Sequence, residues 1–207
     1  MFILAISSRV RRYLSPLFVI VLLLSSADLH AQMPAWQTNF RLQVFSPKVK
    51  TIVYEGKLFL KGLKARIEPA DAEEIDLYDF ETQMEIRIFP KDGIYFRKSL
   101  SLAKQIKAAK EGWGPMPESF HEKKVLLRKG NFKGQAARLY FITIERQTQT
   151  AYMMRWVTDE AMPLPLRAIY SGSGRETIIV DFEPKKDANL RDETFTPPSD
   201  YLSLNPF

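Results

Sequence analysis

A short run of carboxylates holds the residue types in this chain that are best suited to chemistry. Five acidic residues follow Pro69 in close succession: Asp71, Glu73, Glu74, Asp76 and Asp79. Two carboxylates held a suitable distance apart can hydrolyse a glycosidic bond, and their oxygens can also bind Ca²⁺ weakly. The run has the character of a polar loop that enters a strand, however, and it lacks the EF-hand spacing. A solvated acidic edge is therefore the simpler interpretation, and a carbohydrate hydrolase is a minor alternative.

Other catalytic and metal-binding sets are missing from the sequence. The 207 residues contain no cysteine and two histidines, and one of these, His121, lies in a polar stretch beside lysine. This composition excludes thiol catalysis and thiolate metal sites, and a lone histidine cannot assemble a transition-metal centre at the usual spacings. No Gly-x-Ser-x-Gly elbow and no phosphate-binding loop occurs. We therefore expect a protein that is not an enzyme, with no catalytic residues, no metal and no cofactor.

The remaining polar pattern of interest lies on a predicted helix. Ser99 can cap a helix that runs to Lys110 and stops before Gly112. Lys104, Lys107 and Lys110 fall along one side of that helix. They could face an anionic membrane surface or an acidic inner-membrane partner, or they could simply be solvated. On the apolar side, Leu100 and Ile106 are candidates for a lid over a neighbouring sheet.

Most of the chain alternates apolar and polar residues with period two, which predicts strands. In the segment 83–89, Met84, Ile86 and Ile88 alternate with Gln83, Glu85 and Arg87, and Asp92-Gly93 then marks a hairpin turn. Similar patterns predict further strands, about nine to eleven in all, at 40–45, 52–61, 64–68, 94–97, 124–128, 136–146, 150–158, 164–170 and 176–182. Strands with short connections and one helix indicate a mainly β (α+β) fold, built as a curved antiparallel sheet or unclosed β-barrel with one or a few covering helices.

The N-terminus has the features of a secretory signal peptide. Three arginines precede an apolar core at 17–24, and small residues lead to a cleavage site near Ala31. We expect residues 1–31 to be removed and residues 32–207 to form a single domain in the periplasm. No cysteine follows the apolar core, so a lipid anchor is not expected. Export and a mild net charge of +6 argue against nucleic acid as a partner.

An apolar cavity is the functional feature that the strand patterns favour. A sheet covered by a single helix and some loops can leave part of its concave face open, and methionines and aromatics suit apolar surfaces that accept varied ligands. The candidate cavity residues come from several predicted strands, and which face of the sheet points inward is left open. They are Met84, Ile86, Ile88, Phe96, Tyr140, Ile142, Met154 and Trp156.

Three stretches resemble the LolA-like periplasmic lipoprotein-carrier superfamily. Residues 54–68 resemble its opening hairpin, and residues 84–97 resemble its strand, short turn and returning strand. Residues 164–182, together with Thr194-Phe-Thr-Pro-Pro198, are similar to its "Leu-Pro" strand, glycine turn and closing "F-x-x-P-P". The resemblance implies an unclosed barrel with helices in its mouth and an apolar cavity that shields acyl chains.

The same resemblance implies a polar residue that holds the lid closed. The family has an arginine at the end of its second strand, where this chain has Lys61, followed by Arg66. Taken together, the resemblance implies a soluble periplasmic carrier that moves lipid or lipoprotein acyl chains toward the outer membrane. A non-enzymatic envelope sensor or interaction protein with the same fold is the alternative.

Overall fold

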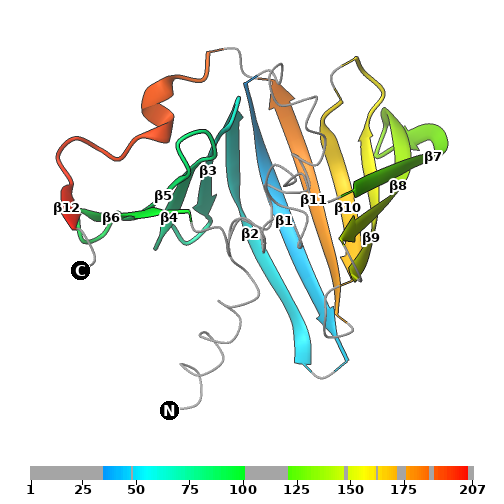
Figure 1. Cartoon of the computed structure of the whole chain (residues 1–207), viewed down its shortest axis with the longest axis horizontal. Coiled ribbons are helices and arrows are strands. Elements are labelled where there is room, and N and C mark those ends of the chain that lie inside the picture. The colour runs from blue at the N-terminus through cyan, green and yellow to red at the C-terminus, as the bar shows by residue number, and fades with distance from the viewer. Residues whose placement is uncertain are drawn as a thin grey trace.

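The computed structural model describes residues 35–47, 49–100, 121–146, 149–161, 163–171, 176–186 and 189–204. The expected signal peptide and most of the expected helix at 99–110 lie outside these ranges. The described chain is almost entirely β-structure (Figure 1). Its strands are β1 (Trp36–Ser46), β2 (Val49–Lys61), β3 (Lys64–Pro69), β4 (Ile75–Asp79), β5 (Met84–Phe89), β6 (Ile94–Ser99), β7 (His121–Phe132), β8 (Gln135–Arg146), β9 (Gln149–Thr158), β10 (Pro165–Ser171), β11 (Thr177–Lys186) and β12 (Leu202–Leu204).

All twelve strands belong to one sheet that does not close into a barrel. Their order across the sheet is β12-β6-β5-β4-β3-β2-β1-β11-β10-β9-β8-β7. Neighbouring strands pair antiparallel except β12, which runs parallel to β6. The predicted curved, unclosed sheet is confirmed, and this parallel edge strand is an addition to it.

Local sequence explains the sharp connections between these strands. Gly62 and Gly93 adopt φ angles of +55° and +62°, in the left-handed region that favours glycine. Gly62 joins β2 to β3, and Gly93 completes the predicted Asp-Gly turn between β5 and β6. Ser99 ends β6, and the Leu100 amide donates to the Gln83 carbonyl at 2.7 Å, while the helix expected after Ser99 lies outside the described residues.

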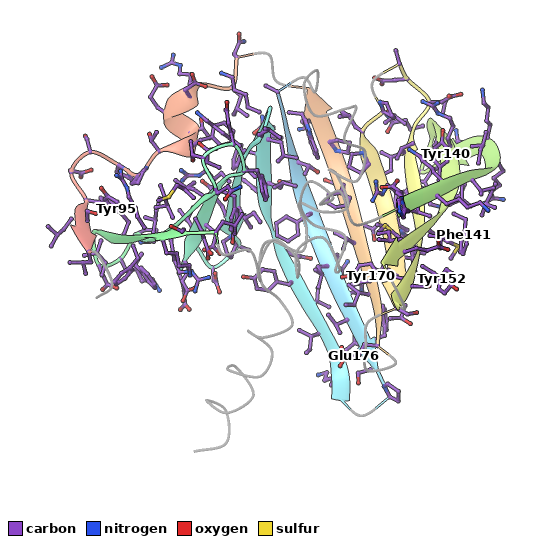
Figure 2. The ribbon with its side chains drawn as sticks, viewed as in Figure 1. Tyr95, Tyr140, Phe141, Tyr152, Tyr170 and Glu176 are labelled. Carbon is purple, nitrogen blue, oxygen red and sulfur yellow. The ribbon has the colours of Figure 1, made fainter. Side chains whose placement is uncertain are left out.

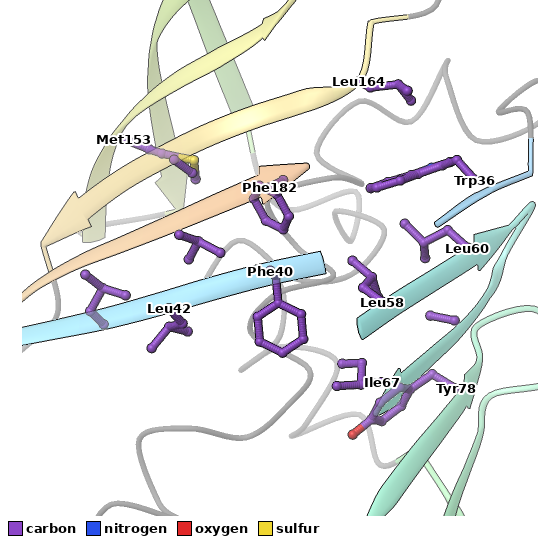
Figure 3. Close-up of a cluster of buried hydrophobic side chains, with 14 of the residues drawn as sticks. Trp36, Phe40, Leu42, Leu58, Leu60, Ile67, Tyr78, Met153, Leu164 and Phe182 are labelled. Carbon is purple, nitrogen blue, oxygen red and sulfur yellow. The ribbon is translucent and has the colours of Figure 1, made fainter. Parts of the chain in front are cut away.

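Cross-strand pairing assigns each side chain to one of two faces, because residues directly opposite in a ladder point to the same side. We call the side of Phe40, Leu42 and Val44 the inner face, and the side of Arg41 and Gln43 the outer face. The inner face carries one buried apolar cluster that draws residues from eight strands, from β4 across to β8 (Figure 3). Outer-face apolar residues instead form two separate clusters toward the ends of the sheet. The largest apolar cluster of the described residues thus belongs to the inner face.

The C-terminal segment covers one end of the outer face. It contains the short 3-10 helix η2 (Asp192–Phe195) and ends in β12. The side chains of Leu190 and Phe195 in this segment are buried. Tyr201 joins the outer cluster of Ile75, Leu77 and Ile88, and its hydroxyl donates to the Pro90 carbonyl at 3.3 Å. Figure 1 shows this segment passing beside β3–β6 at the end of the sheet opposite β7.

Candidate functional site

The inner face carries the largest buried apolar cluster in the described part of the chain. Its central residues are fully or almost fully buried, and Figure 3 shows them projecting from neighbouring strands toward a common space. The residues that dominate it by size are Trp36, Phe40, Leu42, Leu58, Ile67, Tyr78, Ile142 and Phe182.

The structure divides the eight predicted cavity residues between the two faces. Phe96, Tyr140 and Ile142 lie on the inner face. Phe96 is opposite Arg87, and the row of paired residues continues across the sheet through Asp76, Ile67 and Leu58. At the other end, Ile142 is opposite Met153. The other five lie on the outer face, and they are Met84, Ile86, Ile88, Met154 and Trp156. No single cavity can therefore contain all eight.

The five outer residues have contacts of their own. Ile86 and Ile88 pack under the C-terminal segment with Tyr201. Trp156 stacks on Phe132, with ring centroids 5.2 Å apart, and Arg128 lies over its ring at 4.8 Å. Figure 2 shows Phe141 and Tyr152 at this same end of the sheet.

The four lid and polar candidates fall at three places. Lys61 donates to the Leu190 carbonyl at 3.0 Å and pairs with Asp192 at 2.9 Å, and Arg66 donates to the Thr194 carbonyl at 3.0 Å. Both side chains therefore fasten the C-terminal segment to the outer face. Leu100 is buried in the inner cluster, and Ile106 lies outside the described residues.

Charged side chains line the β4–β6 end of the inner face and pair with one another there. Arg87 bonds Asp76 at 2.9 Å and also lies 3.3 Å from Glu74. Glu85, which is 1% exposed, pairs with Lys98 at 3.0 Å. Burial raises the pKa of Asp76 to about 6, and Arg87 opposes this shift without cancelling it. This end of the inner face thus satisfies its charges internally.

The β7–β9 end of the inner face is different, and it contains a residue that sequence reasoning missed. Arg155 is paired with Tyr140 on β8 and with Ala168 on β10, so it points to the inner face. It is only 6% exposed. A signal for it was present in the sequence: the alternation of Ala151, Met153 and Arg155 places this arginine on the same face as two apolar residues.

The outer face contains an open groove of about 850 Å³ across β1, β2, β10 and β11. It is lined by many charged side chains, several of them paired: Arg167 bonds both oxygens of Asp181, at 2.8 and 2.9 Å, and Arg41 lies 3.4 Å from Glu55. Burial favours a higher pKa for Asp181, but hydrogen bonds and charge from Arg167 and Lys133 outweigh it and lower that pKa. Such a lining does not suit an acyl chain.

Ion pairs and turn hydrogen bonds hold the carboxylates of the acidic run. Glu74 and Asp76 are tied to Arg87, whereas the Asp79 carboxylate accepts the backbone amides of Glu81 and Thr82 in the following turn. In the described ranges, no group of three or more histidine, cysteine, aspartate or glutamate residues could hold a metal ion. Those ranges also contain no helix of the length and apolarity that a membrane span requires.

Comparison with solved structures finds proteins of similar architecture. An uncharacterized conserved protein from Thermus thermophilus superimposes with a TM-score of 0.53 over 85% of this chain and 93% of its own, at 12% identity. The two chains share a fold. The matches also include LolA superfamily and lipoprotein-sorting proteins, the group that the sequence motifs resemble.

Two such proteins show how low the sequence identity and structural similarity are. A LolA superfamily protein from Nitrosomonas europaea matches at 14% identity and a TM-score of 0.43, over 87% of this chain and 96% of its own. A putative outer membrane lipoprotein-sorting protein domain from Vibrio parahaemolyticus matches at 9% identity and a TM-score of 0.42, over 82% and 92%. No protein-family model and no curated protein sequence matches the chain.

Proposed function

We propose that this protein is a soluble periplasmic carrier that binds lipid or lipoprotein acyl chains against the inner face and moves them toward the outer membrane. The observation that carries the proposal is the large apolar cluster on the inner face of an unclosed sheet. Each buried CH₂ group is worth roughly 0.8 kcal/mol, so a diffusing acyl chain gains strongly from such a surface. The proposal includes removal of residues 1–31 on export and a single domain from residue 32 to 207.

Within this proposal, the inner-face members of the predicted set contact the acyl chain. Phe96, Tyr140 and Ile142 lie on the correct side of the sheet, together with Met153 and Phe182. Leu100 and Ile106 belong to the segment that we propose covers the bound chain. The outer groove is not part of the site, because its lining is rich in charged side chains.

Two tyrosines at one end of the sheet provide a matched test of this assignment. Tyr140 lies on the inner face of β8 and is partly buried, whereas Tyr152 lies on the outer face of β9 and is 58% exposed (Figure 2). Each is replaced in turn by the photoreactive residue p-benzoyl-phenylalanine. The purified protein is then loaded with oleate, irradiated and weighed intact. We expect an oleate adduct from position 140 and none from position 152.

Equal adducts at the two positions, or an adduct at 152 alone, would contradict the inner-face assignment. The control is oleate added after denaturation, where neither position should label. Because both substitutions replace tyrosine with a larger aromatic, a general effect of the probe cancels between them.

We also propose that strand β7 touches an anionic membrane surface during loading or delivery. Three successive apolar side chains of this edge strand are exposed by 43–52%, namely Val125, Leu126 and Leu127. Lys123 precedes them, and Arg128 and Lys129 follow. Apolar side chains flanked by cations favour binding at an interface that carries anionic headgroups.

The change Leu127→Ser should weaken co-sedimentation with phosphatidylglycerol vesicles several-fold, because it removes an apolar side chain from the contact. Leu202→Ser is the matched control, since Leu202 is 63% exposed on β12 at the opposite end of the sheet. Sedimentation of the wild-type protein that is no greater with phosphatidylglycerol than with phosphatidylcholine would refute the contact.

A further inference from the structure

Arg155 is a buried cation on an apolar surface. It lies on the inner face between Tyr140 and Ala168, and the inner-cluster residues Ile142 and Met153 lie close by on the same face. Only 6% of its surface is exposed. A guanidinium removed from water at such a place is costly unless a carboxylate or another oxyanion pairs with it.

The described part of the chain supplies no such pair. The hydrogen bond of Arg155 is from Nη2 to the Met153 sulfur at 3.3 Å, and its Nε has no partner. No described carboxylate lies within ion-pair distance of it. Burial lowers the pKa of Arg155 to about 10, and the charge of Glu122 opposes the shift without cancelling it. Arg155 therefore remains charged at neutral pH.

At the opposite end of the inner face, an arginine is paired with carboxylates. Arg87 pairs with Asp76 at 2.9 Å and with Glu74 at 3.3 Å. Elsewhere, Arg167 bonds both oxygens of Asp181. Arg155 departs from this pattern, because its Nε has no hydrogen-bond partner and its Nη2 donates to a sulfur atom.

A second cation stands beside Arg155. The Lys124 ammonium lies 4.3 Å from the centre of the Tyr140 ring, and Tyr140 is the cross-strand neighbour of Arg155. Burial, followed by the positive charge of Arg155, lowers the pKa of Lys124. Glu122 lies on the same face of β7, and its negative charge opposes the lowering of the pKa of both cations without cancelling it. Two cations at the edge of an apolar face form a place where an oxyanion and an apolar chain can be bound together.

We propose that Arg155, with Lys124, binds the anionic headgroup of an amphiphile whose acyl chain lies along the inner face. The assignment rests on the acyl-chain carrier function proposed above and narrows its ligand class to lipids with a carboxylate or phosphate headgroup. Arg155 binds the oxyanion by charge-assisted hydrogen bonds, and Lys124 adds charge from β7. Ile142 and Met153 contact the first part of the chain.

The test is competition against a fluorescent anthroyloxy-stearate probe at neutral pH, with two competitors that share one chain. Oleate carries a carboxylate, and oleyl alcohol carries none. We expect oleate to displace the probe at a concentration at least roughly tenfold lower than oleyl alcohol, as expected for hydrogen bonds to a charged group. Arg155→Met should reduce this preference to about twofold or less, and Lys124→Met should reduce it partly.

Lys91→Met is the control variant, because Lys91 lies in the exposed turn after β5, where it pairs with Glu73. It should leave the oleate preference unchanged. The comparison of oleate with oleyl alcohol on the wild-type protein needs no variant, so it stands even if Arg155→Met fails to fold. Dioleoyl phosphatidate in place of oleate shows whether a phosphate headgroup is also accepted.

The outcomes separate the two proposals. Displacement by neither competitor, with no probe binding, overturns the carrier function itself. Equal displacement by oleate and oleyl alcohol in the wild-type protein keeps the carrier function and overturns the headgroup site. Loss of the oleate preference in millimolar inorganic phosphate would show a site for free oxyanions, which also overturns the headgroup assignment.

Discussion

Replacing Gly56 with alanine is expected to cost about 3 kcal/mol or more of unfolding free energy, at the upper end for overpacked cores. Gly56 lies in the middle of β2, where it pairs with Phe40 on β1 and with Pro69 on β3. A Cβ atom at this position would meet the backbone carbonyl of Glu68, and it would lie 2.9 Å from two atoms of the Phe40 ring. Neither the paired strand nor the buried ring can move away without disturbing the inner cluster. Chemical denaturation with urea gives the free energy directly.

Gly130 is a matched control for this change. It also lies in a strand, β7, but no atom comes within 4 Å of the position its Cβ would take. Gly130→Ala should therefore change the unfolding free energy by less than about 0.5 kcal/mol. If the two variants are equally stable, the close packing of Phe40 over β2 is incorrect.

The second large effect is a loss of stability as pH rises from about 4 to about 6. The folded protein holds the Asp76 proton more tightly than the unfolded chain, because the pKa of Asp76 rises from 3.8 to about 6 on burial. Below pH 4 both states are protonated, and above pH 6 both are ionised. Between these values the unfolded state loses its proton first, so folding becomes less favourable. The difference sets an upper limit of about 3 kcal/mol on this contribution.

Asp76→Asn removes the titrating group and should flatten the stability curve in this pH window. Asp92→Asn is the control, since Asp92 lies exposed in the turn between β5 and β6. The measurement is the urea midpoint and slope at several pH values, and the decisive quantity is the pH dependence rather than the absolute stability. A wild-type curve that is flat or rises between pH 4 and 6 would contradict the burial of this carboxylate.

Most strand locations could be predicted from the sequence because period-two alternation is a local property, although β4 is missed because its residues belong to the run interpreted as a polar loop. The segment from Met84 to Phe89 and its Asp-Gly turn are found where the pattern places them. The assignment of faces could not be predicted in the same way. In β5, the apolar residues Ile86 and Ile88 face the outer side, whereas Glu85 points to the inner face and is 1% exposed.

The physical reason is that the C-terminal segment covers the outer side of this end of the sheet. The C-terminal segment supplies an apolar partner for Ile86 and Ile88, through Tyr201, so the apolar set turns outward. The charged set then faces inward, where Arg87 and Lys98 neutralise Asp76 and Glu85. The usual assumption that charged residues face water would therefore assign the inner and outer faces of β5 the wrong way round.

Contacts between residues far apart in the chain also could not be predicted from the sequence. Lys61 and Arg66 bond backbone carbonyls of Leu190 and Thr194, more than 120 residues away. The strand β12 has three residues, too few to show a period. Arg155 could have been found, because its alternation with Met153 places a charge on an apolar face, and that single conflict is the feature on which the headgroup site depends.

The central claim is that the inner face binds acyl chains, and native mass spectrometry of protein purified from the periplasm without detergent tests it most directly. We predict a population heavier than the polypeptide by the mass of a lipid, which collisional activation releases as an intact acyl-chain compound. After delipidation, added oleate should restore a complex of one-to-one stoichiometry. A single peak at the polypeptide mass, together with no complex after oleate is added, would contradict the account.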